Sequence, residues 1–401
     1  MTIDICFALY DPQGTYSRNV GIAMQSIFEH TKENVCVHLL HDDTLTADNK
    51  EKFDELVKNA GQSIEYHRVQ LPDELLRLEV TNTFGVGTLF RLMLPELLDP
   101  SIQTTIYFDA DILVTCDVAD FYRLMEGAGA SVLVVKELSL TYFAPKTRRL
   151  FDTGVLDEAT YFNAGVMVFN LRKVRANYDI RKAVLDFFRT YPDCSFADQD
   201  AYNYIFLNDK KLIDGRYNCQ SLSLRGEGRS IDGIYHFAGD TIRPVPEESF
   251  ETLYFETWKR TPWGDTSSFQ AYYISELQTC QMQLAAWRTL WTATRSARIV
   301  LFGARSVLTR RCIEALHLDP ANDLAMDNAP SLWGKDAFGL TIASPAWLKS
   351  KEAKDVYVIV LSNLHYPEIK QQLETEYGLR CGEHFIDGRR LLENVKFFAA
   401  Q

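Results

Sequence analysis

Two acidic residues separated by one position end a short apolar run, Ile106-Tyr107-Phe108-Asp109-Ala110-Asp111. On an extended chain, side chains at positions i and i+2 point to the same side, so the carboxylates of Asp109 and Asp111 can reach one cation. Oxygen ligands of this kind suit Mn²⁺ (or Mg²⁺), and such an ion would neutralise a diphosphate. Because α/β sheets bind ligands at the carboxyl ends of their strands, this position predicts a metal site.

The elements that must position these acids alternate between strands and helices. Residues 3–8, 35–40 and 64–69 have the apolar or alternating pattern of strands, and 16–30 and 45–60 have helical patterns. Further strands are predicted at 104–108, 131–135 and 166–169. This repetition predicts an α/β fold with a mostly parallel sheet covered by helices.

The length of 401 residues predicts more than one domain, because single cores stop growing near about 250–300 residues. The expected division is a catalytic domain over 1–265, a helical connector over 266–295 and a smaller Rossmann-like α/β domain over 296–401. In the last domain a strand leads into Phe302-Gly303-Ala304-Arg305, which lacks the remaining glycines of a dinucleotide fingerprint. We therefore expect it to serve in dimerisation, acceptor docking or as a scaffold.

Several segments in a fixed order resemble the retaining glycosyltransferases of family 8, which have the GT-A fold. The resemblance extends from about residue 3 to 263. The matching segments are Phe7-Ala8, Thr88-Leu89-Phe90-Arg91-Leu92 on a predicted helix, Phe108-Asp109-Ala110-Asp111, Tyr161-Phe162-Asn163-Ala164-Gly165-Val166, Ala197-Asp198-Gln199-Asp200 and Tyr235-His236-Phe237-Ala238-Gly239. A D-x-D triplet alone is common, whereas an ordered set of this kind is far more specific.

The resemblance implies that Asp109, Asp111 and His236 bind the metal. An imidazole is a suitable ligand for Mn²⁺, although an isolated histidine is more often structural. Arg91 resembles the family's helix arginine near the donor. The alternative is a surface arginine without this role.

The resemblance also implies roles beside the transferred sugar. Asn163 and Ala164 would let backbone and amide approach it, unless they form an ordinary turn before the next strand. Asp198 would hold the sugar hydroxyls, and Gln199 would lie near the anomeric carbon. A neutral amide is a poor nucleophile, so we expect same-face substitution rather than a covalent intermediate.

The sequence departs from the family's pattern at two places. Where many relatives carry an acid that contacts uracil, this chain has Ala8-Leu9-Tyr10-Asp11, so stacking by Tyr10 and substitution by Asp11 are both open. For the diphosphate, Arg243 is the expected cation, with Lys259 and Arg260 as an alternative source. The predicted donor-binding residues are Ala8, Tyr10, Asp11, Arg91, Asp109, Ala110, Asp111, Asn163, Ala164, Asp198, Gln199, His236, Gly239 and Arg243.

Composition limits the partners. A net charge of −12 argues against nucleic acid, and the absence of a basic leader or a long apolar run predicts a cytoplasmic protein without a transmembrane segment. A peripheral position at the inner membrane face and self-association through the second domain remain open. The expected function is metal-dependent transfer of glucose or galactose from a UDP-sugar to a glycan, lipid-linked or glycoprotein acceptor. The alternatives are an inactive nucleotide-sugar-binding module and, less favoured because of the broken glycine motif, an NAD-dependent oxidoreductase.

Overall fold

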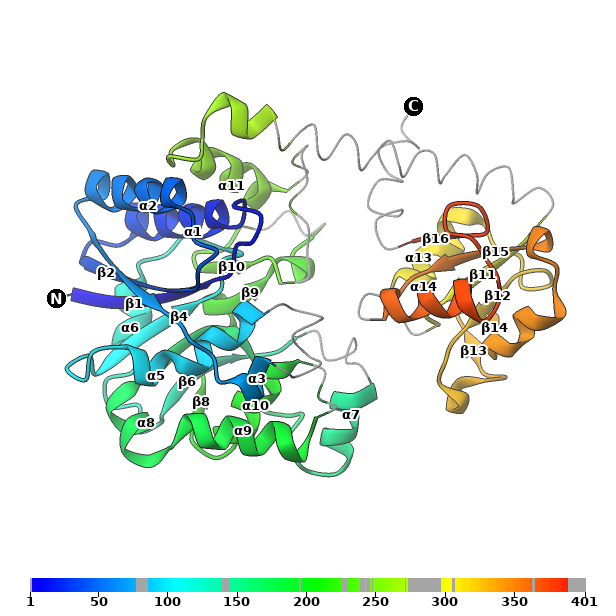
Figure 1. The fold of residues 1–401 in the computed structure, drawn as a ribbon, viewed down its shortest axis with the longest axis horizontal. Helices are drawn as coiled ribbons and strands as arrows, with labels where there is room; N and C mark the ends of the chain where they lie inside the picture. Colours follow the sequence, from blue (N-terminus) through cyan, green and yellow to red (C-terminus); the bar gives the residue numbers. More distant parts are fainter. Residues whose placement is uncertain are drawn as a thin grey trace. The chain divides into compact units, whose positions relative to one another are not determined.

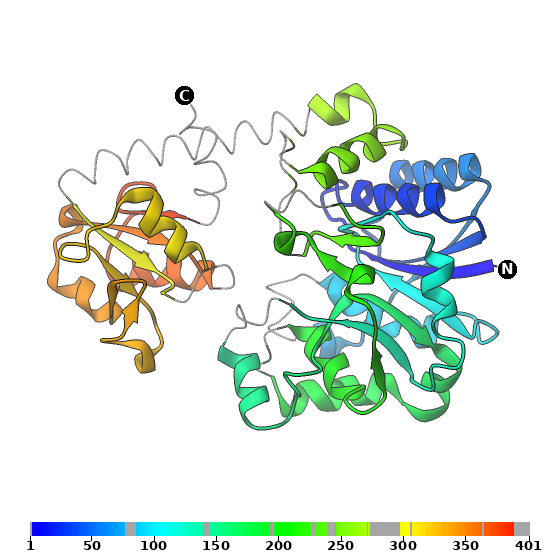
Figure 2. The same ribbon diagram turned by 180° about the vertical axis from the view of Figure 1, so that it is seen from behind.

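The computed structural model describes residues 2–76, 86–138, 145–192, 194, 196–225, 230–238, 242, 246, 248–270, 272, 297–304, 307–362 and 365–388. The chain divides into two compact units, Met1–Phe269 and Gln270–Gln401, which are drawn in Figures 1 and 2. Most of the predicted helical connector lies outside the described residues.

A seven-stranded sheet of order β3-β2-β1-β4-β7-β6-β8 forms the centre of the first unit. Its strands are β1 (Thr2–Leu9), β2 (Asn34–His41), β3 (Ser63–Arg68), β4 (Thr104–Phe108), β6 (Val132–Lys136), β7 (Phe162–Asn170) and β8 (Lys210–Leu212). All neighbouring pairs are parallel except the two that β7 makes, with β4 and with β6. The predicted α/β fold with a mostly parallel sheet is therefore confirmed.

Helices cover both faces of this sheet. Figure 1 shows α1 and α2 on one side and α8, α9 and α10 on the other. The helices are α1 (Ser17–His30), α2 (Ala47–Ala60), α3 (Asp73–Leu76), α5 (Leu94–Leu97), α6 (Val118–Arg123), α7 (Pro145–Asp152), α8 (Leu171–Asn177), α9 (Ile180–Thr190), α10 (Ala197–Ile205) and α11 (Ser249–Lys259), with 3₁₀ helices η1 (Val86–Met93), η3 (Gly215–Asn218) and η4 (Ser221–Ser223). Residues 88–92, which we predicted to be helical, lie in the 3₁₀ helix η1.

Strand β7 begins earlier than the sequence pattern predicted. It starts at Phe162 rather than at Val166, so residues 163–165 belong to the strand and are not a turn before it. The register against β6 shifts between Val134 and Val135, which pair with Met167 and Asn163, so the segment between those partners forms a bulge. Asn and Gly disfavour strands locally, and the two neighbouring strands overrule that preference here.

A second, three-stranded sheet of order β5-β10-β9 lies beside the end of β4. Its strands are β5 (Ile112–Val114), β9 (Cys219–Gln220) and β10 (Ile234–His236). In the antiparallel pair β5-β10, His236 is the partner of Ile112, and the amide of Phe237 donates to the carbonyl oxygen of Asp111 at 2.8 Å. This pairing brings a histidine from late in the chain to the two acids.

The second unit is built on a six-stranded sheet of order β13-β14-β12-β11-β15-β16. Its elements are β11 (Arg298–Phe302), α13 (Val307–Leu316), β12 (Leu324–Met326), η5 (Pro330–Leu332), β13 (Asp336–Ala337), β14 (Leu340–Ala343), η6 (Pro345–Ser350), η7 (Ala353–Asp355), β15 (Val356–Val360), α14 (Tyr366–Thr375) and β16 (Phe385–Asp387). Apart from β13, the strands are parallel, and their spatial order of 3-2-1-4-5 in chain sequence is the order of the doubly wound nucleotide-binding fold. Gly303 follows the first of them with φ of +113°, a conformation that favours glycine.

Close packing of α1 against Trp263 yields a stability prediction. A Cβ atom at Gly21 would lie 2.4 Å from the Trp263 ring, which is held by a hydrogen bond to Asn49 and by packing on Phe53. We expect Gly21→Ala to lower the free energy of unfolding by about 1–3 kcal/mol in urea titrations, because the overpacking outweighs the helix propensity of alanine. At Gly215 no atom lies within 4 Å of the added carbon, so Gly215→Ala should change stability by less than about 0.5 kcal/mol. A Gly21→Ala protein as stable as the wild type would contradict this.

Candidate active site

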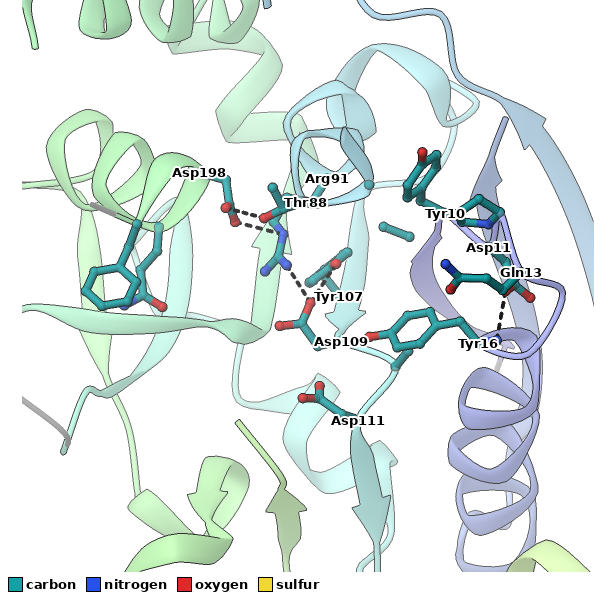
Figure 3. Close-up of a pocket in the computed structure, with 16 residues that line it drawn as sticks. Tyr10, Asp11, Gln13, Tyr16, Thr88, Arg91, Tyr107, Asp109, Asp111 and Asp198 are labelled. Carbon is teal, nitrogen blue, oxygen red and sulfur yellow. Dashed lines mark hydrogen bonds and ion pairs between the residues drawn. The ribbon is translucent and has the colours of Figure 1, made fainter. Parts of the chain in front are cut away.

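A cavity of about 550 Å³ opens at the carboxyl ends of β1 and β4, and Figure 3 shows the side chains around it. It is lined by Ala8, Tyr10, Asp11, Pro12, Gln13, Tyr16, Gly87, Thr88, Arg91, Tyr107, Asp109, Ala110, Asp111, Phe196, Asp198 and Gln199. Its location is where α/β sheets bind their ligands.

Asp109, Asp111 and His236 form a compact group at the cavity wall. The Nε2 atom of His236 lies 3.3 Å from Oδ1 of Asp111 and 3.9 Å from Oδ2 of Asp109, and one ligand atom from each residue lies within 4.8 Å of the others. A Cβ atom at Gly165 would lie 2.3 Å from the His236 ring and 2.6 Å from the Asp109 carboxylate. Glycine at this position therefore leaves space beside a donor set that suits a divalent cation.

A directional series of hydrogen bonds fixes which nitrogen of His236 is available. The Asn163 side chain donates to Glu137 and accepts from the amide of Gly165, both at 2.9 Å, which fixes the orientation of its amide. Asn218 donates to the Asn163 oxygen at 2.9 Å, so its own oxygen faces Nδ1 of His236 at 2.8 Å. Nδ1 must then carry the proton, and Nε2 faces the acids with its lone pair when the ring is neutral.

The charges of this group affect one another. Burial alone would lower the pKa of His236, but the negative charges of Asp111 and Asp109 outweigh it and raise the pKa above its ordinary value. Burial would raise the pKa of Asp111, and the charge and hydrogen bond of His236 lower it instead. A protonated His236 therefore forms an ion pair with Asp111, whose Oδ1 lies 3.3 Å from Nε2.

Arg91, on η1, lines the cavity and contacts three segments around it. Its guanidinium donates to the carbonyl oxygen of Ala164 at 2.7 Å and to Oδ1 of Asp109 at 2.6 Å, and its Nε lies 3.0 Å from Oδ2 of Asp198. The group also lies over the Tyr107 ring, 4.6 Å from its centroid. Burial opposes the charge, but the two carboxylates outweigh it and raise the pKa of Arg91, so the arginine stays charged.

Asp198 and Gln199 begin α10 at the same wall. Asp198 accepts a hydrogen bond from the Thr88 hydroxyl in addition to its ion pair with Arg91. The side-chain oxygen of Gln199 accepts from the amide of Ala164 at 3.0 Å, and its NH₂ group faces the Glu137 carboxylate at 3.4 Å. Because one neighbour can only donate and the other only accepts, the orientation of the Gln199 amide is determined.

The loop between β1 and α1 is organised by Asp11. Each of its carboxylate oxygens accepts two hydrogen bonds, from the amides of residues 15–17 at 2.8 Å and from the hydroxyl of Ser17 at 2.6 Å, and Asp11 is only 2% exposed. Tyr10 lies beside it on the cavity wall (Figure 3), close to Gly87, where a Cβ atom would lie 2.5 Å from Cβ of Tyr10. The Tyr10 side chain takes no part in the hydrogen bonds that engage Asp11 at the start of α1.

The structure brings most of the predicted residues together. Ala8, Tyr10, Asp11, Arg91, Asp109, Ala110, Asp111, Asp198 and Gln199 line the cavity. Asn163, Ala164 and His236 are buried beside them, and Asn163 and Ala164 use their polar groups to position neighbours rather than to line the cavity. Gly239 and Arg243 lie outside the described residues. Lys259 and Arg260 pair with Glu256 and Glu29 and do not line the cavity.

Sequence reasoning missed several contributors, among them Glu137, Asn218 and Tyr16. Glu137 and Asn218 act through hydrogen bonds formed between segments far apart in the chain, and no local pattern marks them. Tyr16 was recognised only as the start of a helix, whereas its ring points from the loop toward Asp109 (Figure 3). Of these residues, Tyr16 had a signal in the sequence, namely its place at the end of the loop that joins the first predicted strand to the first predicted helix.

The fold of the first unit is of the GT-A type. Residues 9–240, more than half of the chain, match the model of glycosyl transferase family 8, and the protein belongs to that family. The resemblance predicted from the ordered segments is thus confirmed. No helix in the described part of the chain is both long and apolar enough to cross a bilayer.

Individual relatives agree with this assignment. General stress protein A of Bacillus subtilis is 27% identical over 269 residues, which cover 61% of this chain and 91% of the relative. Lipopolysaccharide 1,3-galactosyltransferase of Salmonella typhimurium is 23% identical over 258 residues, 64% of this chain and 71% of the relative. The crystal structure of the galactosyltransferase LgtC, with donor and acceptor sugar analogs, shares the fold with a TM-score of 0.55 at 19% identity, over 65% of this chain and 96% of LgtC.

The charge balance around His236 predicts a pH-dependent metal affinity. A metal ligand must offer the Nε2 lone pair, and below the raised pKa of His236 that nitrogen carries a proton. We expect the Mn²⁺ affinity, measured by titration calorimetry, to fall about tenfold per pH unit below this pKa and to level off above it. His236→Gln should bind more weakly and lose this dependence near neutral pH. An equal slope in the variant would assign the proton to another group.

Proposed function

We propose that the chain is a metal-dependent, retaining glycosyltransferase that moves glucose or galactose from a UDP-sugar to a glycan, lipid-linked or glycoprotein acceptor. The observation that carries this proposal is a cavity lined by Asp109 and Asp111, with His236 buried next to them, and by Arg91, Asp198 and Gln199. The cavity volume of about 550 Å³ is in the range of small-molecule sites.

The donor would lie across the cavity from Tyr10 to Gln199. We assign the base to the Tyr10 end, where a phenol ring offers a stacking surface, because the Asp11 carboxylate already accepts four hydrogen bonds. The sugar lies at the Asp198 end. The assignment of a galactosyl or glucosyl donor draws on relatives named lipopolysaccharide 1,3-galactosyltransferase and 1,2-glucosyltransferase.

Asp109, Asp111 and His236 are the residues that would hold Mn²⁺ or Mg²⁺. The bound ion would supply positive charge that stabilises the departing diphosphate. The protein's part is to hold the two carboxylates side by side and to present Nε2 of His236 to them. The hydrogen bond from Nδ1 to Asn218 sets that orientation of the ring. Arg91 holds the Asp109 carboxylate in position, leaving its Oδ2 atom toward His236.

Transfer with retention requires that the acceptor hydroxyl attack the anomeric carbon on the face from which the diphosphate departs. The bond from that carbon to the phosphate oxygen breaks, the new glycosidic bond forms, and the hydroxyl proton passes to the departing phosphate oxygen. The Gln199 oxygen accepts one hydrogen bond, from Ala164, and retains a lone pair that can stabilise positive charge at the anomeric carbon. Asp198, fixed by Arg91 and Thr88, orients the sugar hydroxyls.

A panel of nucleotide sugars tests this function. We expect Mn²⁺-dependent hydrolysis of UDP-glucose or UDP-galactose that a chelator abolishes, and an α-linkage to the acceptor sugar by proton NMR. Asp198→Asn and Gln199→Ala should lower kcat about 10²-fold or more, because each removes a contact near the reacting centre. Asp120→Asn, which changes an acid on the exposed surface of α6, is the matched control and should keep full activity.

Three results would contradict the proposal. Full turnover after exhaustive chelation would remove the metal from the mechanism. A β-linked product would exclude retention. A folded protein that binds UDP-sugars without turning any of them over would favour the inactive binding module.

We also propose that the second unit takes no part in the chemistry and serves in self-association, acceptor docking or as a scaffold. The described cavity residues all precede Phe269, the last residue of the first unit. A chain ending at Phe269 should therefore retain donor hydrolysis within about tenfold, a change of about 1.4 kcal/mol in the barrier. Circular dichroism and a melting curve must first establish that it is folded. Complete loss of hydrolysis in a folded truncation would refute this division.

A further inference from the structure

A second group of metal-ligating side chains lies on the sheet away from the cavity. Asp4 of β1, Cys36 and His38 of β2, and Glu65 and His67 of β3 come together there. In the parallel register Asp4 pairs with Cys36 and His38 pairs with Glu65, and paired residues carry their side chains on the same face of a sheet. None of these five residues lines the cavity.

Three of these residues have their ligand atoms at the spacing of a zinc site. Nδ1 of His38 lies 3.0 Å from Nε2 of His67 and 3.4 Å from Oε2 of Glu65, and the last two atoms are 3.7 Å apart. Ligands about 2.0–2.1 Å from a tetrahedral Zn²⁺ ion are about 3.3 Å from one another. The observed separations lie on both sides of that value, so the group needs only small movements to accept the ion.

The central histidine of this group is already oriented. His38 is 1% exposed, and its Nε2 atom lies 2.9 Å from Oδ1 of Asp4. A carboxylate that accepts the N–H of one imidazole nitrogen directs the other nitrogen to a metal and makes it a better ligand, an arrangement typical of zinc sites. Here the second nitrogen, Nδ1, faces Glu65 and His67 on the neighbouring strand.

We propose that His38, Glu65 and His67 bind Zn²⁺, with Asp4 as the residue that positions His38. The Glu65 side chain is 57% exposed, so water can reach the group and supply a fourth ligand. Strand β3 is an edge strand of the sheet, so the ion joins it to β2. An ion that binds the folded chain and not the unfolded chain stabilises the fold by mass action. Asp4 and Cys36 form an overlapping group with His38, but the hydrogen bond to Asp4 occupies Nε2 of that histidine.

Zinc stoichiometry in the full-length chain tests this site. The His236→Gln background reduces binding at the active-site group. In that background, we compare the parent protein with added His67→Gln or Glu65→Gln, and with His30→Gln as the matched control. His30 contacts the Ser26 carbonyl oxygen and belongs to neither group. After equilibrium dialysis, we expect the parent and His30→Gln proteins to hold one more zinc ion per chain than the His67→Gln protein.

Two further measurements distinguish a bound metal ion from a proton shared between His38 and His67. Zinc should raise the Tm of the parent and not that of His67→Gln, and Co²⁺ should give the visible absorption of a tetrahedral site only when His67 is present. Glu65→Gln changes a largely exposed side chain, so it provides the test if His67→Gln does not fold. Zinc content or a Tm shift that is equal with and without His67 would overturn the proposal, because a proton alone would then hold the two rings together.

Discussion

The position of the Arg91 guanidinium is the constraint on which the rest of the active site depends. It links three separate segments, the bulged strand β7 through Ala164, the end of β4 through Asp109 and the start of α10 through Asp198. A buried pair of this kind costs about 3–5 kcal/mol when one partner is removed, because the remaining charge is left uncompensated. Arg91 thus makes it possible to hold the buried Asp198 carboxylate and the partly buried Asp109 carboxylate close to a third, that of Asp111.

A second requirement is space and direction at His236. Gly165 leaves room for the histidine and the Asp109 carboxylate, and the bulge of β7 sets the backbone that places it there. The pairing of β10 with β5 brings His236 to this space, and the hydrogen bonds from Asn163 through Asn218 fix its tautomer. The strand pairing sets the position of His236, and the side-chain amides set which of its nitrogens faces the acids. Both are needed to form the group of Asp109, Asp111 and His236.

The sequence predicted most strands of the central sheet, and the place of the two acids at the end of β4, because these signals are local. The apolar run before Asp109 and the alternation of strands with helices need no tertiary information, and β4 has the predicted bounds. The bulge of β7 was missed, since neighbouring strands impose it on residues that disfavour strands. The role of Asp11 was also beyond local reasoning. An acid near the base site suggests a ligand for uracil, but its carboxylate is used up by the amides at the start of α1. Only the folded structure shows which carboxylates are already engaged in hydrogen bonds.

The two histidine groups of the first unit differ in how one ring nitrogen is held, and this difference predicts which cation each prefers. At His236 a neutral amide, Asn218, accepts from Nδ1, and two carboxylates provide the remaining ligands. Such a hard, oxygen-rich set suits Mn²⁺ or Mg²⁺. At His38 a carboxylate, Asp4, holds the ring through Nε2, which makes Nδ1 more basic, and Nε2 of His67 lies 3.0 Å from that Nδ1 atom. Sets with two imidazole nitrogens favour zinc, so we expect the ligand atoms to select Mn²⁺ or Mg²⁺ beside the cavity and Zn²⁺ at the edge of the same sheet.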